Sequence, residues 1–251
     1  MSLMLHQVSK TWGGVRALCD VSMDISFSSI TGLIGPNGAG KSTLFGAICG
    51  TVPIDQGTIR FGTQVLDGLD PARRARCGLL RSFQVPRPFD NLTVRANLAV
   101  AARHQVGESL ANVLFRPAYV RHRETEISAQ VESVIATLNL AAVADRAASQ
   151  LSGGQLKLLE FGRLLMADPK LLLLDEPFAG VNPVLAEQIA DCIRLLNSRG
   201  IGFFIIEHDL RALSRLASTL FAMDRGAVIA SGVPDDVLSN QQLRAAYVGA
   251  A

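Results

Sequence analysis

Nine consecutive residues decide the fold of this chain: residues 35–43 have the sequence GPNGAGKST. The apolar stretch Thr31–Ile34 before them predicts a strand, and Lys41–Cys49, closed by Gly50, predicts a helix. This strand–loop–helix context is what the pattern G-x-x-x-x-G-K-[ST] requires, and a chance match is expected in only about one chain in a hundred of this length. We therefore predict a phosphate-binding loop in an α/β domain.

Each residue type in this loop has a chemical reason to be there. Glycines let the backbone turn tightly and aim its N–H groups at phosphate oxygens, and the helix start adds its positive dipole end. Lys41 is expected to bridge the β- and γ-phosphates of ATP, and the hydroxyl of Ser42 to ligate Mg²⁺. The candidate ATP-binding residues of the loop are Gly35, Pro36, Asn37, Gly38, Ala39, Gly40, Lys41, Ser42 and Thr43.

Two acidic residues follow a second apolar run. Leu171–Leu174 is typical of a central parallel strand buried on both faces, and Asp175 and Glu176 come directly after it. Because ligands of open α/β sheets bind at the carboxyl ends of strands, Asp175 is predicted to hold Mg²⁺ and Glu176 to orient or deprotonate the attacking water. The alternative is a strand that ends in a solvated turn at Pro177.

A histidine occupies a similar position after a third apolar run. His208 follows the predicted strand Phe203–Ile206 by two residues. By the same strand-end rule it is expected to contact the γ-phosphate or to position Glu176 as a catalytic partner. A single histidine can also be an ordinary packing residue, and that alternative is the one adopted for the other three histidines.

The order of predicted elements indicates an α/β core interrupted by helices. The first 30 residues alternate between apolar and polar, as half-buried strands do, with a turn at Gly13-Gly14. No strand is predicted for residues 93–150. After Gly154 helices and strands alternate again, which implies a mostly parallel sheet. We predict one domain over residues 1–251, with residues 1–85 and 156–251 as the α/β core and residues 86–155 as an inserted helical subdomain. Further expectations are helices over residues 94–103, 127–138 and 156–166, a hairpin over 221–230, a short final helix from Pro234, and a polar connection over 104–123. The basic residues 121–123 of that connection are expected to be solvated rather than to contact lipid headgroups.

Composition limits the classes of partner. The 251 residues are 49% hydrophobic and 18% charged, which indicates a large buried core, a partner surface, or both. A net charge of +2 does not favour nucleic-acid binding, and four dispersed cysteines do not favour a metal site. No stretch approaches the roughly 18 apolar residues of a membrane span and no secretory signal is visible, so we expect a soluble chain whose membrane role comes through partners.

A second glycine motif narrows the class of protein. Residues 151–155 are LSGGQ and precede the predicted helix 156–166, so Ser152 can cap a helix start whose open N–H groups suit an anion. With this string the chain resembles the ATP-binding cassette family over nearly its whole length. The resemblance implies a P-loop NTPase fold with an antiparallel N-terminal β part and a helical subdomain. It also implies that Ser152, Gly153, Gly154 and Gln155 contact the ATP that is held by a second ATP-binding subunit.

The resemblance implies two more site residues. Trp12 matches the aromatic that stacks on adenine, although it can also be a buried strand residue. Gln84 matches the glutamine that contacts Mg²⁺ or water and links the core to the helical subdomain, although it can also be an ordinary loop residue. With Ser42 and Asp175, Gln84 completes the expected metal set. Asn182 departs from the family, because many members have Asp there, and this puts the salt-bridge role of that loop in doubt.

The finer resemblance is to the ATP-binding subunits of branched-chain amino-acid importers. It is carried by the sequence around Asn182, the connection 104–123, residues 206–209 and the tail 246–249. It implies a homodimer or a sister subunit, two integral membrane permeases, an indirect substrate-binding protein, no nucleic acid, and a peripheral place on the cytoplasmic face of the inner membrane. Urea or amide importers, lipopolysaccharide-export ATPases and non-transport cassette ATPases remain alternatives, and a kinase or GTPase is disfavoured because it would have no use for LSGGQ.

Overall fold

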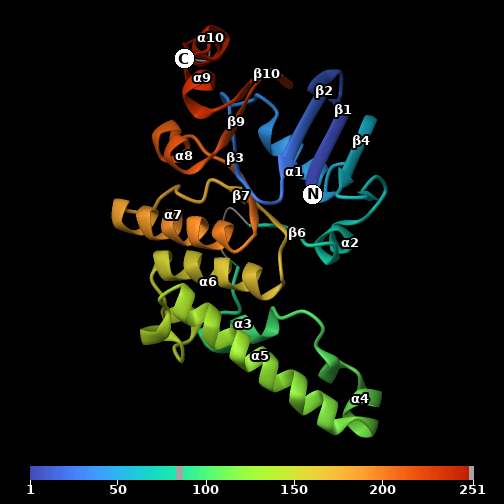
Figure 1. Ribbon diagram of the computed structural model, residues 1–251, viewed down its shortest axis with the longest axis vertical. Coiled ribbons are helices and arrows are strands. Elements are labelled where there is room, and N and C mark those ends of the chain that lie inside the picture. Colours follow the sequence, from blue (N-terminus) through green and yellow to red (C-terminus); the bar gives the residue numbers. More distant parts are fainter. Residues whose placement is uncertain (83–86, 249–251) are drawn as a thin grey trace. The chain divides into compact units, whose positions relative to one another are not determined.

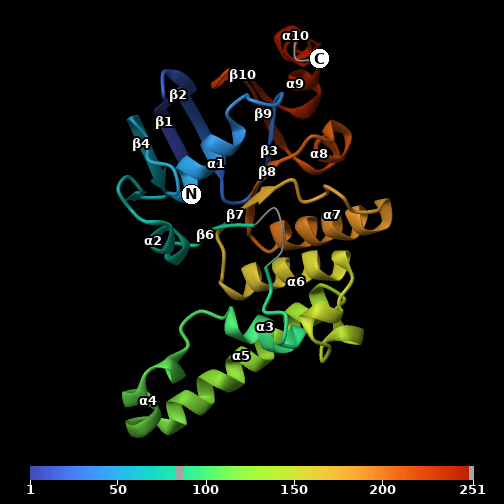
Figure 2. The same cartoon turned by 180° about the vertical axis from the view of Figure 1, so that it is seen from behind.

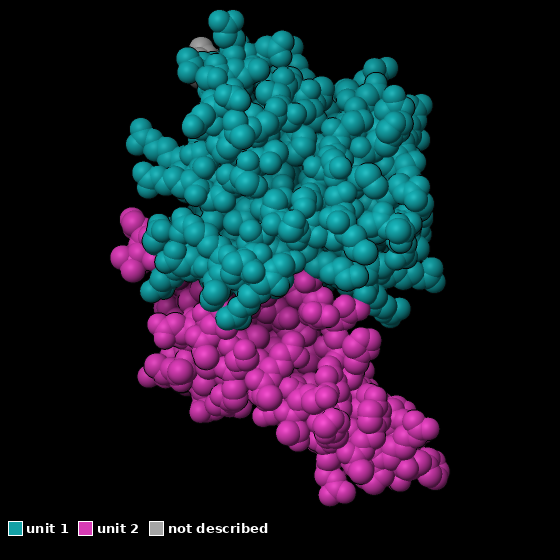
Figure 3. All heavy atoms as spheres, viewed as in Figure 1, with its two compact units in different colours: residues 1–81, 170–180, 186–251 teal, residues 82–169, 181–185 magenta. Residues whose placement is uncertain are grey.

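The computed structural model describes residues 1–82 and 87–248, and its contacts divide the chain into two compact units. Unit 1 comprises residues 1–81, 170–180 and 186–251, and unit 2 comprises residues 82–169 and 181–185 (Figure 3). The sequence-based boundaries at residues 85 and 155 differ from these, and the assignment of functional domains stays a prediction. No helix among the described residues is long and apolar enough to cross a membrane.

Unit 1 contains two sheets. The first sheet has the order β2-β1-β4-β5 and is antiparallel throughout, as predicted for the N-terminal part. Its strands are β1 (Ser2–Trp12), β2 (Val15–Ser26), β4 (Gln56–Phe61) and β5 (Gln64–Val65). The turn at Gly13-Gly14 joins β1 to β2, and Val21, Met23 and Ile25 point into the core as their alternation predicts.

The second sheet has the order β10-β9-β3-β8-β7-β6, and its strands from β9 to β6 are parallel. Its strands are β3 (Ile30–Ile34), β6 (Leu79–Arg81), β7 (Leu171–Asp175), β8 (Gly202–Ile206), β9 (Thr219–Asp224) and β10 (Ala227–Gly232). All residues of β3 and β8 and the four leucines of β7 are buried, and Thr31 of β3 is the one polar side chain among them. The predicted hairpin turning at residues 224–226 is β9–β10.

Helix α1 (Lys41–Cys49) lies between the two sheets (Figure 1). Its buried face, which includes Leu44 and Phe45, shares one apolar core with residues of β1, β2 and β4 on one side and of β3, β7, β8 and β9 on the other. Phe45 also contacts Phe204 with ring centroids 5.1 Å apart. The helix that carries the phosphate loop is therefore fixed by apolar packing against both sheets.

Further helices complete unit 1. They are α2 (Pro71–Arg76), α8 (Leu210–Leu216), α9 (Pro234–Ser239) and α10 (Gln241–Val248). On the face of β3 opposite α1, a side chain at Gly32 would collide with Leu213 of α8, so the helix packs directly on the strand backbone. Figure 2 shows α8, α9 and α10 following one another near β9. The prediction that the helix at Pro234 is the final one is wrong, because α10 follows it.

Unit 2 is helical among its described residues. Its helices are α3 (Val94–Val100), α4 (Leu110–Phe115), α5 (Pro117–Thr137) and α6 (Gly153–Met166), with single turns η1 (Val106–Glu108), η2 (Ala141–Val143) and η3 (Ala148–Gln150). Gly162 of α6 lets the helices approach, because a Cβ there would lie 2.7 Å from Leu98 and 2.9 Å from Leu138. Helix α7 (Pro183–Ser198) begins in unit 2 and continues in unit 1.

One expectation for this region is wrong. The basic residues 121–123 were expected in a solvated connection, but they lie inside α5, which begins at Pro117. Proline suits the first turn of a helix because its missing N–H has no partner there. Arg123 is held to the backbone of the preceding segment, since its guanidinium donates to the carbonyl oxygens of Arg103 (2.7 Å) and His104 (3.3 Å).

Candidate nucleotide site

The phosphate loop of unit 1 follows β3 directly and ends at α1. Gly35, Gly38 and Gly40 have positive φ angles of 153°, 81° and 101°, so the turn uses conformations that other residues rarely adopt. A Cβ at Gly35 would lie 2.2 Å from the carbonyl oxygen of Met223, and one at Gly40 would lie 2.4 Å from that of Ala17. The loop therefore needs glycine at both positions for space as well as for conformation.

Lys41 points back into the loop. Its Nζ donates to the carbonyl oxygens of Gly35 (2.6 Å) and Pro36 (2.9 Å), and the residue is only 7% exposed. Burial lowers the pKa of its ammonium, while the carboxylates of Glu176 and Asp175 act in the opposite direction and raise it. The charges of both acids therefore act on the Lys41 ammonium. Ser42 follows it at the exposed start of α1.

Asp175 ends β7 and Glu176 begins the turn after it. The carboxylate of Asp175 is paired with Arg81 of β6, with 2.6 Å between Oδ2 and the guanidinium. Glu176 has a φ of 52°, a strained angle for a residue with a side chain, and its N–H donates to the carbonyl oxygen of Ile206 at 2.9 Å. The backbone of β8 therefore helps to hold the glutamate at the strand end.

His208 lies beside Glu176. Its Nε2 is 2.9 Å from Oε1 of Glu176, and the two side chains are 45% and 23% exposed. The neighbouring Glu207 is almost fully buried and accepts hydrogen bonds from the backbone N–H of Phe178 (2.7 Å) and of His208 (3.1 Å). Burial raises the pKa of Glu207, and these backbone donors lower it. Glu207 thus ties the segment after Glu176 to the segment that carries His208.

Trp12 belongs to the same unit as the loop. It is half exposed at the end of β1, so the alternative of a buried strand aromatic does not hold, and the Nζ of Lys10 lies 4.7 Å from its ring centroid. Strand β2 pairs with β1, the strand that ends at Trp12. At Ala17, β2 reaches the phosphate loop, because the carbonyl oxygen of Ala17 limits the space at Gly40. The hairpin that carries Trp12 therefore runs alongside the phosphate loop.

The LSGGQ string lies in unit 2 at the start of α6. Ser152 Oγ accepts from the N–H of Gln155 at 3.3 Å, and Gln155 Oε1 accepts from the N–H of Ser152 at 3.0 Å, which together form a capping box. Ser152 and Gly153 are exposed, and Gly154 and Gln155 are partly exposed. The predicted cap is therefore present, with the positive end of a 14-residue helix at the surface of its unit.

Gln84 lies outside the described residues. The described segment immediately after it is held to α6, because Arg163 donates to the carbonyl oxygen of Arg87 at 2.7 Å and its guanidinium lies 5.2 Å from the ring of Phe89. Asn182 has a local role that the sequence did not indicate. Its Oδ1 accepts from the N–H of Leu185 at 2.8 Å, which caps the first turn of α7.

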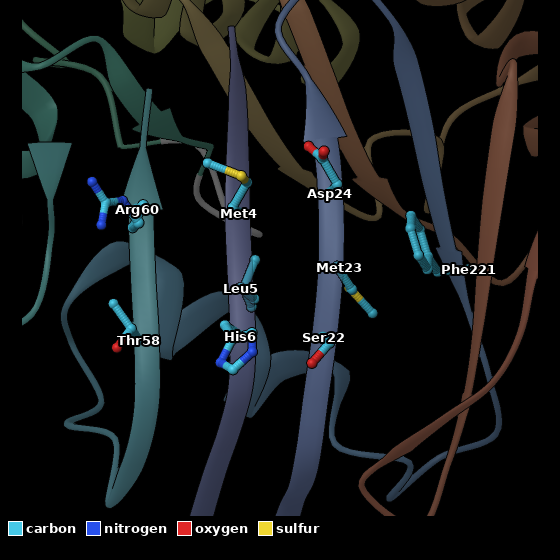
Figure 4. Close-up of a pocket in the computed structure, with 9 residues that line it drawn as sticks. All are labelled: Met4, Leu5, His6, Ser22, Met23, Asp24, Thr58, Arg60 and Phe221. Carbon is cyan, nitrogen blue, oxygen red and sulfur yellow. The ribbon is translucent and has the colours of Figure 1, made fainter. Parts of the chain in front are cut away.

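Four residues of unit 1 that contact the site residues or the far end of helix α1 were not predicted from the sequence. They are Arg81, Glu207, Tyr247 and Arg74. Position after an apolar run could have pointed to Glu207. Arg81 and Arg74 belong to short elements that no periodicity reveals, and Tyr247 reaches the loop from a helix 212 residues away. A cavity of about 650 Å³ over the antiparallel sheet contains none of the predicted site residues; it is lined by Met4, Leu5, His6, Ser22, Met23, Asp24, Thr58, Arg60 and Phe221 (Figure 4).

A glycine-rich loop with a buried lysine, two strand-end acids and a histidine defines a P-loop nucleotide hydrolase. Residues 18–179 match the model of the ABC transporter family, and the chain belongs to that family as its ATP-hydrolysing subunit. A probable branched-chain amino acid transport ATP-binding protein LivG from Methanocaldococcus jannaschii is 37% identical over 98% of this chain and 97% of that protein. The high-affinity LivG of Escherichia coli K12 is 32% identical over 99% and 98%.

Solved structures agree with this assignment. A nucleotide-free ATP-binding cassette from an ABC transporter has a TM-score of 0.83 at 36% identity, covering 98% of this chain and 99% of that chain. The ADP conformation of an ATP-binding cassette has a TM-score of 0.82 at 34% identity, covering 99% of both chains. The predicted fold class, a P-loop ATPase core with an antiparallel N-terminal part and a helical subdomain, is confirmed.

Proposed function

We propose that this chain hydrolyses Mg-ATP in a pair with a second ATP-binding subunit and thereby drives import of branched-chain or related amino acids. The observation that carries the hydrolytic part is the 2.9 Å contact between Glu176 and His208 at the strand ends, in the same unit as the glycine loop and its buried Lys41. The cargo rests on the full-length similarity to proteins named for branched-chain amino acid transport.

The loop binds the triphosphate. The backbone N–H groups of residues 35–43 and the start of α1 supply donors and a positive dipole end, and Lys41 supplies a full charge. When ATP binds, phosphate oxygens replace the two loop carbonyls that Lys41 now contacts, and the ammonium gains stronger partners. Trp12 stacks on the adenine, for which its exposure and its place beside the loop are suitable.

The residues present fit a magnesium ion. Its expected ligands are the hydroxyl of Ser42, the carboxylate of Asp175 and the amide of Gln84, all of which are oxygen donors of the kind that Mg²⁺ prefers. When bound, Mg²⁺ neutralises charge on the phosphates. Arg81 binds the carboxylate of Asp175 at the strand end, with 2.6 Å between its guanidinium and Oδ2.

Glu176 orients or deprotonates the attacking water, and His208 positions it. A carboxylate that accepts from His208 keeps one preferred direction, and the strained backbone of Glu176 persists because β8 binds its N–H. No covalent intermediate with the protein is needed, because positioning and charge neutralisation suffice for phosphoryl transfer to water.

The γ-phosphate is contacted by the 152–155 segment of the second subunit. The exposed helix start at Ser152 and Gly153, with its dipole directed outward, supports this arrangement. A homodimer and a pair of sister subunits are both compatible with it. In either case, one subunit alone contains only half of each site.

The chain acts at the cytoplasmic face of the membrane as a peripheral subunit of two permeases, which are fed by a substrate-binding protein. Exposed apolar side chains support a protein partner, because surfaces of this kind mark interfaces. They lie on α4, where Leu110, Leu114 and Phe115 are 80%, 73% and 82% exposed.

Three measurements test the proposal. Uptake of labelled leucine is measured in cells that lack the subunit and carry either the wild-type gene or Lys41→Ala; restored uptake only by the wild type is expected. Uptake of labelled urea, and export of lipopolysaccharide, are measured in parallel. If loss of the subunit leaves leucine uptake unchanged but abolishes urea uptake or lipopolysaccharide export, the amino-acid cargo is wrong and the affected substrate takes its place.

A further inference from the structure

The first glycine of the phosphate loop receives a contact from the far end of the chain. The N–H of Gly35 donates to the hydroxyl oxygen of Tyr247 at 3.1 Å. Tyr247 belongs to α10, and both residues lie in unit 1. None of the predicted nucleotide residues comes from this helix, so the contact links the loop to an element outside the site described above.

Tyr247 is well placed to hold that N–H. Helix α10 is anchored by Leu243, which is 2% exposed, and the preceding α9 by Val237, also 2% exposed. Burial raises the pKa of the Tyr247 phenol, and the bond from Gly35 lowers it. The phenol is therefore neutral at physiological pH and accepts the hydrogen bond through an uncharged oxygen.

Gly35 is bound from three directions. While its N–H contacts Tyr247, its carbonyl oxygen accepts from the Nζ of Lys41 at 2.6 Å. The space at its Cα is closed by the carbonyl oxygen of Met223 on β9. A shift of Gly35 would therefore move the carbonyl that sets the position of the Lys41 ammonium.

The hydroxyl is not needed for docking α10. A phenylalanine would bury the same ring, whereas only the hydroxyl can accept from the loop. We infer that Tyr247 is a positioning residue: it fixes the Gly35 backbone of the nucleotide-free loop, and with it the Lys41 ammonium, in the arrangement that the triphosphate of ATP then binds. This inference rests on the proposed nucleotide binding by the loop.

The experiment uses the full-length protein and the single substitution Tyr247→Phe. The matched control is Tyr119→Phe, because the chain has two tyrosines and Tyr119 is half exposed on α5. Loss of one neutral hydrogen bond is expected to weaken binding of ATP, and to raise the KM for ATP, by about 3- to 10-fold, with kcat changed less than about twofold. Tyr119→Phe should match the wild type in both.

A second measurement reports the bond itself without nucleotide. The amide proton shift of Gly35, followed by NMR in the nucleotide-free protein, should move in Tyr247→Phe and stay in place in Tyr119→Phe. The inference is overturned if the wild type binds ATP and Tyr247→Phe has the same ATP affinity, the same KM and the same Gly35 amide shift. That result would leave the proposed function intact. A wild type that does not bind ATP would instead overturn the proposed function.

Discussion

The Nε2 atom of His208 and the Oε1 atom of Glu176 lie 2.9 Å apart, although 32 positions separate the residues in sequence. Each follows a neighbouring parallel strand, β8 and β7, whose register pairs Asp175 with Ile206. Because parallel strands present their carboxyl ends at one edge, this pairing brings the two side chains together. The buried Glu207 directly precedes His208. Its carboxylate accepts from the N–H of Phe178 and from that of His208, and so holds together the two segments that follow the strands.

Glu176→Gln is expected to keep ATP binding and to lose most hydrolysis. The amide retains the size of the side chain but cannot accept a proton, and removal of a general base typically lowers kcat by about 10²- to 10⁴-fold. The variant should accumulate as an ATP-bound dimer, measured by light scattering with and without ATP. Glu108→Gln, on an exposed turn of unit 2, is the control and should hydrolyse ATP normally. A Glu176→Gln protein that stays monomeric with ATP, with its native partner present, contradicts the composite site.

Much of this arrangement could be predicted from the sequence. The phosphate loop, the strand ends at Asp175 and His208, and the cap at Ser152 each belong to a motif whose local context is contiguous, so pattern alone reveals them. The buried parallel strands β3, β7 and β8 were predicted within one or two residues for the same reason. The contacts of Arg81, Glu207 and Tyr247 could not be predicted, because each depends on which strands or helices become neighbours.

The errors have physical causes as well. The first three turns of α5 have too few buried apolar positions to show a helical period, because only Val120 is buried before Val131. Strand β6, with three residues, and α10, with mixed polarity, are too short for periodicity to mark them. Tertiary packing, rather than local propensity, defines these elements.

Gly35→Ala is expected to abolish ATP binding and to lower stability. The new Cβ would lie 2.2 Å from the carbonyl oxygen of Met223, which is backbone of a buried strand and cannot move away cheaply. Gly107→Ala is the matched control, because its Cβ would meet its nearest neighbour, Val120, at an ordinary 3.6 Å. Thermal unfolding and binding of a fluorescent ATP analogue measure the two effects. Normal ATP affinity in Gly35→Ala would show that the loop tolerates a side chain there.

Asn182 can be tested as a helix cap. Asn182→Ala removes the acceptor for the N–H of Leu185 and should lower the free energy of unfolding by about 0.5–2 kcal/mol. Asn182→Asp keeps the acceptor and places a negative charge at the first turn of α7, so it should be as stable as the wild type or more stable by about 0.3–1 kcal/mol. Urea unfolding measures both. If both variants lose the same stability, capping is not the role of this side chain.

The four cysteines should differ in reactivity with pH. Burial raises the pKa of the Cys49 thiol to about 11 and that of the Cys192 thiol to about 12. At pH 8 only about one Cys49 thiol in a thousand is then ionised, and the thiolate is the reactive form. Iodoacetamide labelling followed by mass spectrometry should modify Cys19 and Cys77 first. Cys49, which is also partly exposed, should react more slowly because its thiol pKa is raised, and the buried Cys192 only after unfolding.

The same shifts predict how stability depends on pH. A thiol whose pKa is raised on folding binds its proton more tightly in the folded state, so its contribution is complete below the unfolded pKa near 9 and is lost above it. The free energy of unfolding should therefore fall as the pH rises from about 9 through 11. In the double variant Cys49→Ala and Cys192→Ala, the free energy of unfolding should decrease less steeply with pH. An unchanged slope would show that other titrating groups cause the decrease.

Arg74 holds the end of the phosphate-loop helix. It is 6% exposed, and its guanidinium donates to the carbonyl oxygens of Ala47 (2.7 Å), Ile48 (2.8 Å) and Leu69 (3.0 Å). The first two belong to the last turn of α1, where carbonyls lack the usual helical partners; that of Ala47 also accepts from the N–H of Gly50 at 3.3 Å. One side chain thus binds the negative dipole end of α1, while the other end of the helix, at Gly40 and Lys41, belongs to the predicted phosphate loop.

Arg74→Met should therefore lower the free energy of unfolding by about 2–3 kcal/mol, because buried carbonyls lose charged donors and methionine fills the space without replacing them. For a chain of this size that corresponds to a melting temperature lower by about 5–10 °C. Arg74→Lys should recover only part of the loss, since an ammonium cannot reproduce the fork of a guanidinium. Arg73→Met, on the same helix with its side chain 65% exposed, is the matched control and should stay within about 0.5 kcal/mol of the wild type. Equal losses from Arg74→Met and Arg73→Met would show that α1 does not depend on this cap.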